Sequence, residues 1–291
     1  EAHGFDVVRL DMSRPFTAAR ARNAGVEHLL EHFPDLKYMQ FVDGDCELDL
    51  GWIHKAAAAL AAEPDVAIVC GTLTERDTQT SIYKRLCDME WQGPVGDIDA
   101  CGGIFMTDMQ AFEQVGRFNP TIPAGEEPEL CKRLAAVGRR IVRLDADMAT
   151  HDAAITTFLQ WWRRGKRTGH GYAYVRAVQG DTNAYGSREI RSAQLWGLAL
   201  PITTTALAIT THGWGALLLL VYPMQVARIA WRMRATAESV SDTCWYAVFC
   251  VLGKFPQALG WLAFERKRLI GDDPQRSHAL LIDSYSTETR V

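Results

Sequence analysis

The sequence lacks an excess of positive charge, which argues against nucleic acid as a partner. Its 31 Lys and Arg residues stand against 35 Asp and Glu residues, so the formal net charge is −4. Proteins that bind nucleic acid depend on a basic surface that neutralises phosphates. With 291 residues, 48% of them hydrophobic, the chain can bury the core of one large domain, or of a domain with an appendage.

The sequence also lacks the cysteine pattern of a disulfide framework. None of its seven cysteines forms a C-x-x-C pair, their number is odd, and most lie in apolar stretches. They are Cys46, Cys70, Cys87, Cys101, Cys131, Cys244 and Cys250. We interpret them as reduced thiols on the cytoplasmic side of a membrane.

The chain begins Glu-Ala-His-Gly-Phe, without an initiator Met or a signal peptide. We therefore expect a fragment that starts within a domain. Strand and helix patterns then alternate: we expect strands at 5–10, 38–43 and 66–72 and helices at 17–33 and 50–65.

Residues 102–151 continue this alternation. A strand and a short helix are expected in 102–120, an acidic loop that runs into a helix in 125–140, and a strand in 141–151 that ends at His151. This order predicts an α/β fold, Rossmann-like, with a mostly parallel sheet and helices on both faces. Ligands of such sheets bind beyond the carboxyl ends of the strands, where Asp43 and Asp45 fall.

Long charge-poor runs follow. Residues 194–231 contain no Asp, Glu or Lys, and the sequence THGWG divides them into two segments of about 18 residues, close to the length that spans a ~30 Å hydrocarbon layer. A third stretch, 243–264, contains Lys254 and Pro256, and we expect it to be interfacial or re-entrant. Basic residues after these segments indicate a cytoplasmic flank. A buried helical hairpin of a soluble protein is the alternative.

Asp43 and Asp45 come directly after an apolar run, one residue apart. Two carboxylates held at a strand end repel each other unless a cation lies between them. Mg²⁺ and Mn²⁺ prefer such hard oxygen ligands and commonly share them with substrate phosphates. Alternatively, the pair belongs to a turn that caps the next helix.

Two further features carry candidate chemistry. Glu126 and Glu127 precede a helix, and one of these carboxylates could accept a proton from a hydroxyl nucleophile; a charged first turn that complements the helix dipole is the simpler explanation. His151 follows a strand and could complete a mixed oxygen and nitrogen metal site, or be an ordinary surface residue.

Together these motifs resemble glycosyltransferase family 2, which has the GT-A fold. They occur in order as ARNAG (21–25), Asp43-Gly44-Asp45, Gly102-Gly103, VGRF (115–118), GEEPELCKRL (125–134) and His151. The resemblance covers residues 1 to about 175 and implies a GT-A-like catalytic domain that lacks its first strand. We expect a linker at 176–193, membrane-associated helices at 194–271 and a C-terminal tail at 272–291.

The resemblance also implies roles for residues. Asp43 and Asp45 match the D-x-D motif that binds the metal and the sugar-nucleotide diphosphate, with His151 as a further metal ligand. Glu127 matches the catalytic base and Glu126 the preceding residue that positions the acceptor, although the family usually has Glu-Asp here. An extra methylene moves a carboxylate by about 1 Å, enough to affect rate.

The remaining expected substrate contacts are Arg22, Asn23, Gly102, Gly103, Trp162 and Arg163. Arg163 could bind the diphosphate and Trp162 could stack on a sugar, or this segment is a helix that lies on anionic lipid. It is similar to the Q-x-x-R-W motif of processive relatives, but Arg164 stands in place of Trp, so we expect no processive synthesis.

The resemblance implies an inverting transfer of a sugar from a nucleotide-diphosphate sugar to a hydroxyl acceptor. The hydrophobic tail is similar to that of bacterial members in the inner membrane that make exopolysaccharides or cell-surface glycans, with the catalytic domain in the cytoplasm. Expected partners are the donor, a glycan or lipid-linked acceptor and membrane lipid; the cofactor is Mg²⁺ or Mn²⁺. The alternatives are a degenerate domain that only binds sugar nucleotide, or a metal-dependent nucleotidyltransferase.

Overall fold

The computed structural model describes residues 4–122, 124–179, 186–234 and 239–271. Contacts divide them into two compact units. The first contains residues 4–74 and 92–152, and the second contains residues 75–91 together with the described residues from 153 onward. Each unit is considered by itself below.

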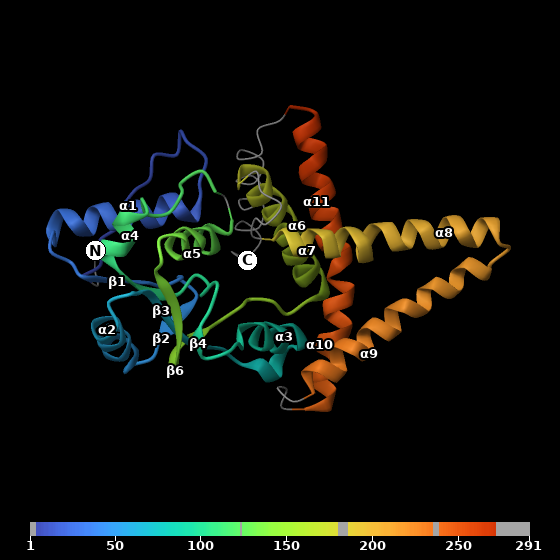
Figure 1. Cartoon of the computed structure of the whole chain (residues 1–291), viewed down its shortest axis with the longest axis horizontal. Coiled ribbons are helices and arrows are strands. Elements are labelled where there is room, and N and C mark those ends of the chain that lie inside the picture. The colour runs from blue at the N-terminus through green and yellow to red at the C-terminus, as the bar shows by residue number, and fades with distance from the viewer. Residues whose placement is uncertain (1–3, 123, 180–185, 235–238, 272–291) are drawn as a thin grey trace. The chain divides into compact units, whose positions relative to one another are not determined.

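The first unit is built on a mixed β-sheet (Figure 1). Its strands are β1 (Tyr38–Phe41), β2 (Cys46–Leu48), β3 (Val66–Glu75), β4 (Gly96–Asp97), β5 (Phe105–Asp108) and β6 (Arg140–His151). They are arranged in the order β1-β5-β3-β6-β2, with β4 beside β6. The pairs β1–β5, β3–β5, β2–β6 and β4–β6 are antiparallel.

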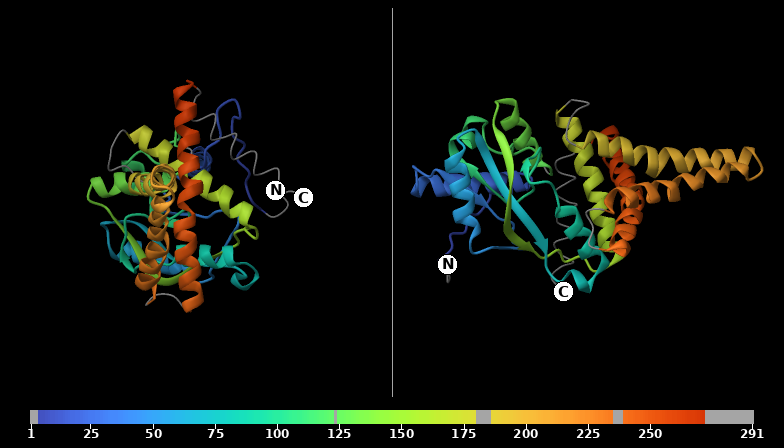
Figure 2. Two further views of the ribbon diagram at one scale, coloured as in Figure 1. Left: turned by 90° about the vertical axis from the view of Figure 1, so that its right-hand side faces the viewer. Right: turned by 60° about the horizontal axis from the view of Figure 1, so that its bottom comes forward.

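Four helices accompany the sheet in the first unit and cover both of its faces (Figure 2). They are α1 (Ala18–His32), α2 (Trp52–Ala62), α4 (Met109–Gln114) and α5 (Glu126–Ala136). The α/β class and the helices expected at 17–33, 50–65 and 125–140 are confirmed. Thr17 caps α1 by accepting a hydrogen bond from the Arg20 backbone, as residues of its type commonly do.

Two expectations about strands are wrong. The sheet is mixed, not mostly parallel, because β5 runs antiparallel to both of its neighbours, β1 and β3, and β2 and β4 each run antiparallel to β6. Residues 5–10 form no strand; Phe5 and Val7 are 73% and 74% exposed. An apolar pattern without a buried face to fill does not make a strand.

Aromatic side chains fill the core beside β1. Phe41, Phe105, Phe112 and Phe118 pack with ring centroids 5.1–6.2 Å apart, in tilted and edge-on contacts that aromatic pairs favour. Phe118 comes from the loop after α4, so the packing of this cluster fixes a loop that lies close to the candidate site described below.

The second unit is helical. It contains η1 (Thr78–Thr80), α3 (Ile82–Trp91), α6 (Phe158–Gln179), α7 (Ser187–Gln194), η2 (Leu195–Ala199), α8 (Leu200–Thr210), η3 (Trp214–Leu220), α9 (Val221–Met233), α10 (Val240–Leu252) and α11 (Lys254–Leu269). Helix α6, expected in the catalytic domain, packs against α11. A Cβ atom at Gly169 would lie 2.1 Å from the Gln257 carbonyl oxygen, and one at Gly260 would lie 2.0 Å from that of Lys166, so glycines permit this close approach.

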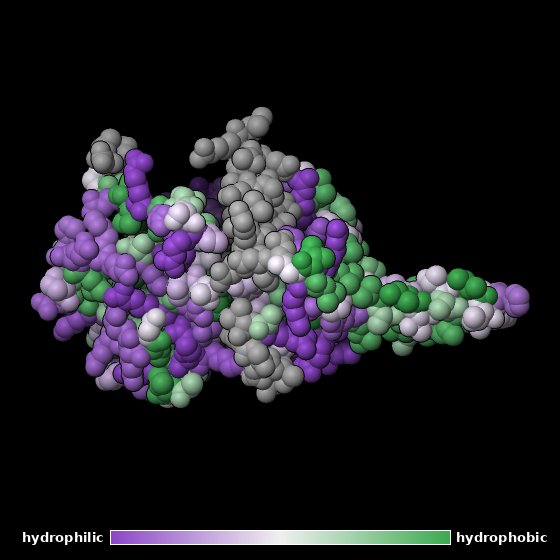
Figure 3. All heavy atoms as spheres, turned by 90° about the horizontal axis from the view of Figure 1, so that it is seen from above, coloured by the Kyte–Doolittle hydropathy of each residue, from purple (hydrophilic) through white to green (hydrophobic). Residues whose placement is uncertain are grey.

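Among the described residues of the second unit, three helical stretches, each made of two or more of these elements, are long and apolar enough to cross a membrane: Ser187–Thr210, Trp214–Met233 and Val240–Leu269. The first two meet at a turn where His212 and Gly213 have positive φ, so the hairpin expected around THGWG is formed (Figure 2). The hairpin has an apolar surface (Figure 3), and none of the most apolar window in Trp214–Met233 is buried.

The third of these helices corrects the interfacial expectation for residues 243–264, because by length and composition it too could span a membrane. In the sequence, Lys254 and Pro256 argued against a spanning helix. Pro256 lies in the first turn of α11, where proline is tolerated because the first backbone N–H groups of a helix have no partner within it.

Candidate functional site

The strand β1 and the short strand β2 hold the two aspartates in the turn between them. Asp43 and Asp45 flank Gly44, and the Cys46 N–H donates to the Asp43 carbonyl at 3.1 Å. The chain therefore reverses within a few residues and leaves both carboxylates at the end of β1. The expected alternative, a cap on the following helix, does not describe this turn, because Asp49 rather than either of them accepts from Gly51 before α2.

Pairing of β2 with β6 brings Asp45 and His151 together. Cys46 lies opposite His151 in the antiparallel register, and the Asp152 N–H donates to the Asp45 carbonyl at 2.9 Å. The His151 Nε2 atom is 3.4 Å from Asp45 Oδ2. Ligand atoms of Asp45, Cys46 and His151 all lie within 4.8 Å of one another, a spacing that a single metal ion could bridge.

Arg22 on α1 joins Asp43 to the acidic end of α5. Its Nη2 donates to Asp43 Oδ1 at 2.7 Å and its Nη1 donates to Glu126 Oε1 at 2.6 Å. The guanidinium also lies 5.6 Å from the centre of the Phe118 ring. Arg22 and Glu126 are only 15% and 12% exposed at their side chains, so this cation neutralises two carboxylates that would otherwise repel each other.

Gly102 and Gly103 form a backbone wall beside this ion pair. A Cβ atom at Gly103 would lie 2.5 Å from Asp43 Oδ2 and 3.0 Å from Arg22 Nη2, so any side chain there would displace the pair. Gly102 has φ +86°, a conformation that favours glycine. Gly103 thus approaches the Asp43 and Arg22 side chains closely, whereas a Cβ atom at Gly102 would meet nothing within 4 Å; the substrate contacts expected of both glycines stay predictions.

Glu127 faces a buried thiol cluster formed by Cys101 and Cys131. Its Oε1 accepts from the Cys101 N–H at 2.6 Å and lies 3.0 Å from each of the two sulfur atoms, which are 4.0 Å from each other. The side chain is 4% exposed. Neighbouring residues of one helix thus point in different directions: Glu126 to Arg22, and Glu127 to the thiols.

Burial raises the pKa of Glu127, because the charged carboxylate loses its hydration. Hydrogen bonds from the Cys101 backbone and from both thiols oppose that rise by stabilising the charged form. Burial also raises the pKa of the Cys101 thiol well above its ordinary value. These thiols are therefore neutral hydrogen-bond donors and not nucleophiles.

Two residues near the cluster hold the loop that carries VGRF. The Asn23 amide donates to the Phe118 carbonyl at 2.8 Å and accepts from the Phe118 N–H at 3.3 Å. Arg133 pairs with Glu129 at 2.7 Å and donates to the Arg117 carbonyl at 2.7 Å. Both hydrogen-bonding groups of Asn23 are thus used within the fold, and its expected contact with a nucleotide stays a prediction.

Trp162 and Arg163 lie on α6 of the second unit. The Trp162 ring packs 5.7 Å from Phe158 and 6.5 Å from Trp161. Their expected contacts with sugar and diphosphate stay predictions. The neighbouring Arg164, which stands in place of the Trp of the Q-x-x-R-W motif, pairs with Glu90 of α3 at 2.9 Å.

Sequence reasoning did not select Cys46 or Cys131 for this site. Cys131 follows Glu127 by four residues on one helix, a spacing that places both side chains on one face and could have indicated the contact. Cys46 carries no such local signal, because its position beside His151 depends on the pairing of strands far apart in sequence.

Comparisons with known proteins gave matches among solved structures alone. No protein-family model and no curated protein matches the sequence. The structures include the mannosyltransferase PcManGT from Pyrobaculum calidifontis with GDP-Man and Mn²⁺ (17% identity, TM-score 0.47, 84% of this chain, 66% of that chain). A second match is GalNAc-T7 with UDP, GalNAc and Mn²⁺ (13% identity, TM-score 0.36, 60% of this chain, 40% of that chain). A third is S. aureus TarS (10% identity, TM-score 0.35, 84% of this chain, 42% of that chain). The chain thus covers less than two thirds of each of these chains.

Proposed function

We propose that the chain is a membrane-associated glycosyltransferase with a GT-A-like catalytic domain, which transfers a sugar from a nucleotide-diphosphate sugar to a hydroxyl acceptor. One observation carries the proposal: the turn after β1 holds Asp43 and Asp45, of which Asp43 joins Glu126 through Arg22 and Asp45 lies 3.4 Å from His151. The order of these motifs in the sequence supports the same reading.

The residues present fit a divalent cation. Asp45 and His151 offer a hard oxygen and an imidazole nitrogen at adjacent positions of paired strands. Asp43 would join them after it exchanges Arg22 for the ion. Mg²⁺ or Mn²⁺, when bound, would supply positive charge that stabilises a departing nucleotide diphosphate.

Arg22 is the side chain that we propose binds the diphosphate of the sugar nucleotide. Its guanidinium is held by two carboxylates and by the Phe118 ring, so it is oriented before any ligand arrives. A diphosphate oxygen is a partner of the same charge and geometry as those carboxylates. Gly102, whose Cβ position has no atom within 4 Å, would leave room for the substrate beside it.

Glu127 is the proposed base and Glu126 the proposed acceptor-positioning residue. A buried carboxylate with a raised pKa is a stronger proton acceptor than an exposed one, and Oε2 of Glu127 would take the acceptor proton while Oε1 stays bonded to the Cys101 loop. The acceptor oxygen then forms a bond to the anomeric carbon as the bond to the diphosphate breaks. Direct displacement inverts the configuration.

We propose a location at the bacterial inner membrane, with the catalytic domain in the cytoplasm; the three helices long enough to cross a membrane support membrane association. We propose that the acceptor is a glycan or a lipid-linked saccharide of exopolysaccharide or cell-surface glycan synthesis, and that one residue is added per encounter.

The test is release of nucleoside diphosphate from UDP- and GDP-sugars by membranes that contain the protein, with and without Mn²⁺. We expect acceptor-dependent release that Asp45→Asn abolishes. Binding of the sugar nucleotide without turnover would instead support the binding-only alternative, and release of pyrophosphate from a nucleoside triphosphate would support nucleotidyl transfer.

A further inference from the structure

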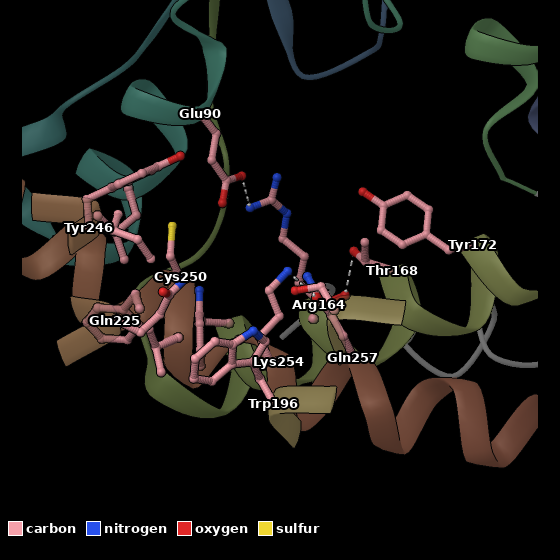
Figure 4. A pocket seen from close by; sticks show the side chains of 18 of the residues that line it. Glu90, Arg164, Thr168, Tyr172, Trp196, Gln225, Tyr246, Cys250, Lys254 and Gln257 are labelled. Atoms are coloured by element: carbon pink, nitrogen blue, oxygen red, sulfur yellow. Dashed lines mark hydrogen bonds and ion pairs between the residues drawn. The ribbon is translucent and has the colours of Figure 1, made fainter. Parts of the chain in front are cut away.

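The second unit contains a cavity of about 760 Å³ that is separate from the residues assigned above (Figure 4). Helices α3 and α6 and all three membrane-length helices contribute to its wall. Trp196 comes from the first membrane-length helix, Gln225 from the second, and Lys254 from the third. Its volume is in the range of cavities that bind small molecules.

The cavity contains two cations and one carboxylate. Arg164 and Glu90 point into it and pair at 2.9 Å, so their charges compensate each other (Figure 4). Lys254 points into the same cavity and donates to the neutral Gln257 side chain at 3.2 Å. Among the described residues, no carboxylate oxygen lies within 4.0 Å of the Lys254 ammonium, although Glu189 is near enough to attract it. The cavity therefore has an excess of one positive charge.

The position of Lys254 makes this excess charge informative. It lies midway along Val240–Leu269, a helix apolar enough to cross a membrane. Charged side chains inside such helices are unfavourable unless they are paired, and they commonly mark a binding site. An anionic ligand would supply the missing partner.

The remaining lining indicates what carries the anion. Trp161, Trp196 and Tyr246 present aromatic faces with polar edges, the side chains that proteins place at the level of lipid headgroups. Gln225 and Gln257 add amide donors. The same helices expose apolar surface outside the cavity, as at Ile202, Met224 and Leu259, which suits acyl chains.

We propose that this cavity binds the phosphate headgroup of a membrane lipid, with the Lys254 ammonium as the main phosphate contact. The Arg164 guanidinium supplies a second positively charged group while it stays paired with Glu90. The inference does not depend on sugar transfer, because it uses no residue of the candidate catalytic site.

The experiment is a lipid titration of the detergent-purified, delipidated protein followed by native mass spectrometry. Phosphatidic acid should give one saturable adduct, with at least about tenfold higher affinity than phosphatidylcholine, whose headgroup carries a compensating positive charge. Lys254→Gln should lower phosphatidic acid affinity by about tenfold, and Lys254→Arg should retain it. A titration with phosphatidylglycerol, whose phosphate is a diester, distinguishes binding of a phosphodiester from binding of the phosphomonoester of phosphatidic acid.

The matched control is Arg266→Gln, which removes one exposed positive charge from the last turn of the same helix, outside the cavity. Equal losses in Lys254→Gln and Arg266→Gln would contradict the proposal, because they would indicate general attraction to anionic lipid. Equal affinity of the wild-type protein for phosphatidic acid and phosphatidylcholine would contradict it even if Lys254→Gln failed to fold. If millimolar inorganic phosphate competed fully with phosphatidic acid, the site would be assigned to a free anion and the proposal of a lipid ligand would be overturned.

Discussion

At the scale of single residues, Asp43 has a cation as its partner, but that cation is Arg22 and not the metal ion that the sequence suggested. The expectation was that Asp43 needs a cation to relieve repulsion, and the structure supplies a guanidinium that Asp43 shares with Glu126. A ligand must therefore compete with an existing ion pair, and the two glutamates have different surroundings although they are adjacent in sequence. That difference allows their roles to be separated.

Glu127→Gln removes the proposed base and keeps its shape. We expect kcat to fall by about 10²–10⁴-fold with little change in donor KM, because only proton removal is lost. Glu126→Gln, the matched control on the preceding residue, should mainly raise the acceptor KM. Steady-state kinetics with a fixed donor distinguishes them, and a larger loss of kcat in Glu126→Gln would exchange the two roles.

The same variant has a signature in stability. Because the pKa of Glu127 is raised in the folded protein, the stability associated with its protonated form is present at low pH and is lost as pH rises through that raised pKa. Glu127→Gln cannot ionise, so its melting temperature should depend less on pH over that interval. An unchanged pH dependence would show that Glu127 is not buried as described.

The thiol of Cys131 should tune the pH dependence of activity. It donates to Glu127 Oε1, and this hydrogen bond opposes the burial that raises the Glu127 pKa. In Cys131→Ala the acid limb of the kcat profile should therefore move to higher pH, because the carboxylate loses one hydrogen bond that stabilises its charged form. Cys131→Ser retains a donor and should move less. Equal displacement in both variants would indicate a packing effect.

At the scale of secondary-structure elements, the pairing of β2 with β6 creates the metal-site geometry. Asp45 and His151 are 106 positions apart in sequence and become neighbours only through this register. A register slip by one residue would turn one of these side chains to the other face. The site therefore depends on the last residues of β6 remaining paired.

Removal of either predicted ligand should weaken Mn²⁺ binding. We expect Asp45→Asn and His151→Ala each to lower the affinity by about 10–100-fold, as measured by calorimetric titration without substrate. His54→Ala, at an exposed position of α2, is the control and should bind as the wild type does. Wild-type affinity in His151→Ala would remove the imidazole from the proposed ligand set.

The sequence predicted helices better than strand directions, for a physical reason. Helix periodicity is a local signal, as is the Glu63-Pro64 pair that follows α2, and α1, α2 and α5 appear where such signals lie. Strand direction depends on partners far away, so the antiparallel β1–β5 and β2–β6 pairs left no local trace. Asp43, Asp45 and His151 could be predicted as candidates, whereas the Arg22 bridge and the thiol cluster at Glu127 depend on tertiary contacts.

At the scale of the whole molecule, composition separates a charged α/β unit from an apolar helical unit. The three membrane-length helices were visible in the sequence as runs with few charges, and the third was underestimated because Lys254 counted against it. That lysine lines a cavity shared by all three helices, so the charge that interrupts the apolar pattern has a place within the helical unit.

A matched pair of methionines tests whether these helices enter a membrane. Met224, near the middle of Trp214–Met233, and Met12, in the first unit, are each 68% exposed. Arginine near the centre of a membrane helix is unfavourable by about 2.5–3.5 kcal/mol, whereas arginine in water at an exposed site is nearly neutral. Met224→Arg should therefore reduce the fraction of protein that resists alkaline carbonate extraction, and Met12→Arg should leave it unchanged. If the hairpin were instead a helical pair of a soluble protein, wild-type protein would be extracted by carbonate, and Met224→Arg would increase its solubility because it covers apolar surface with charge.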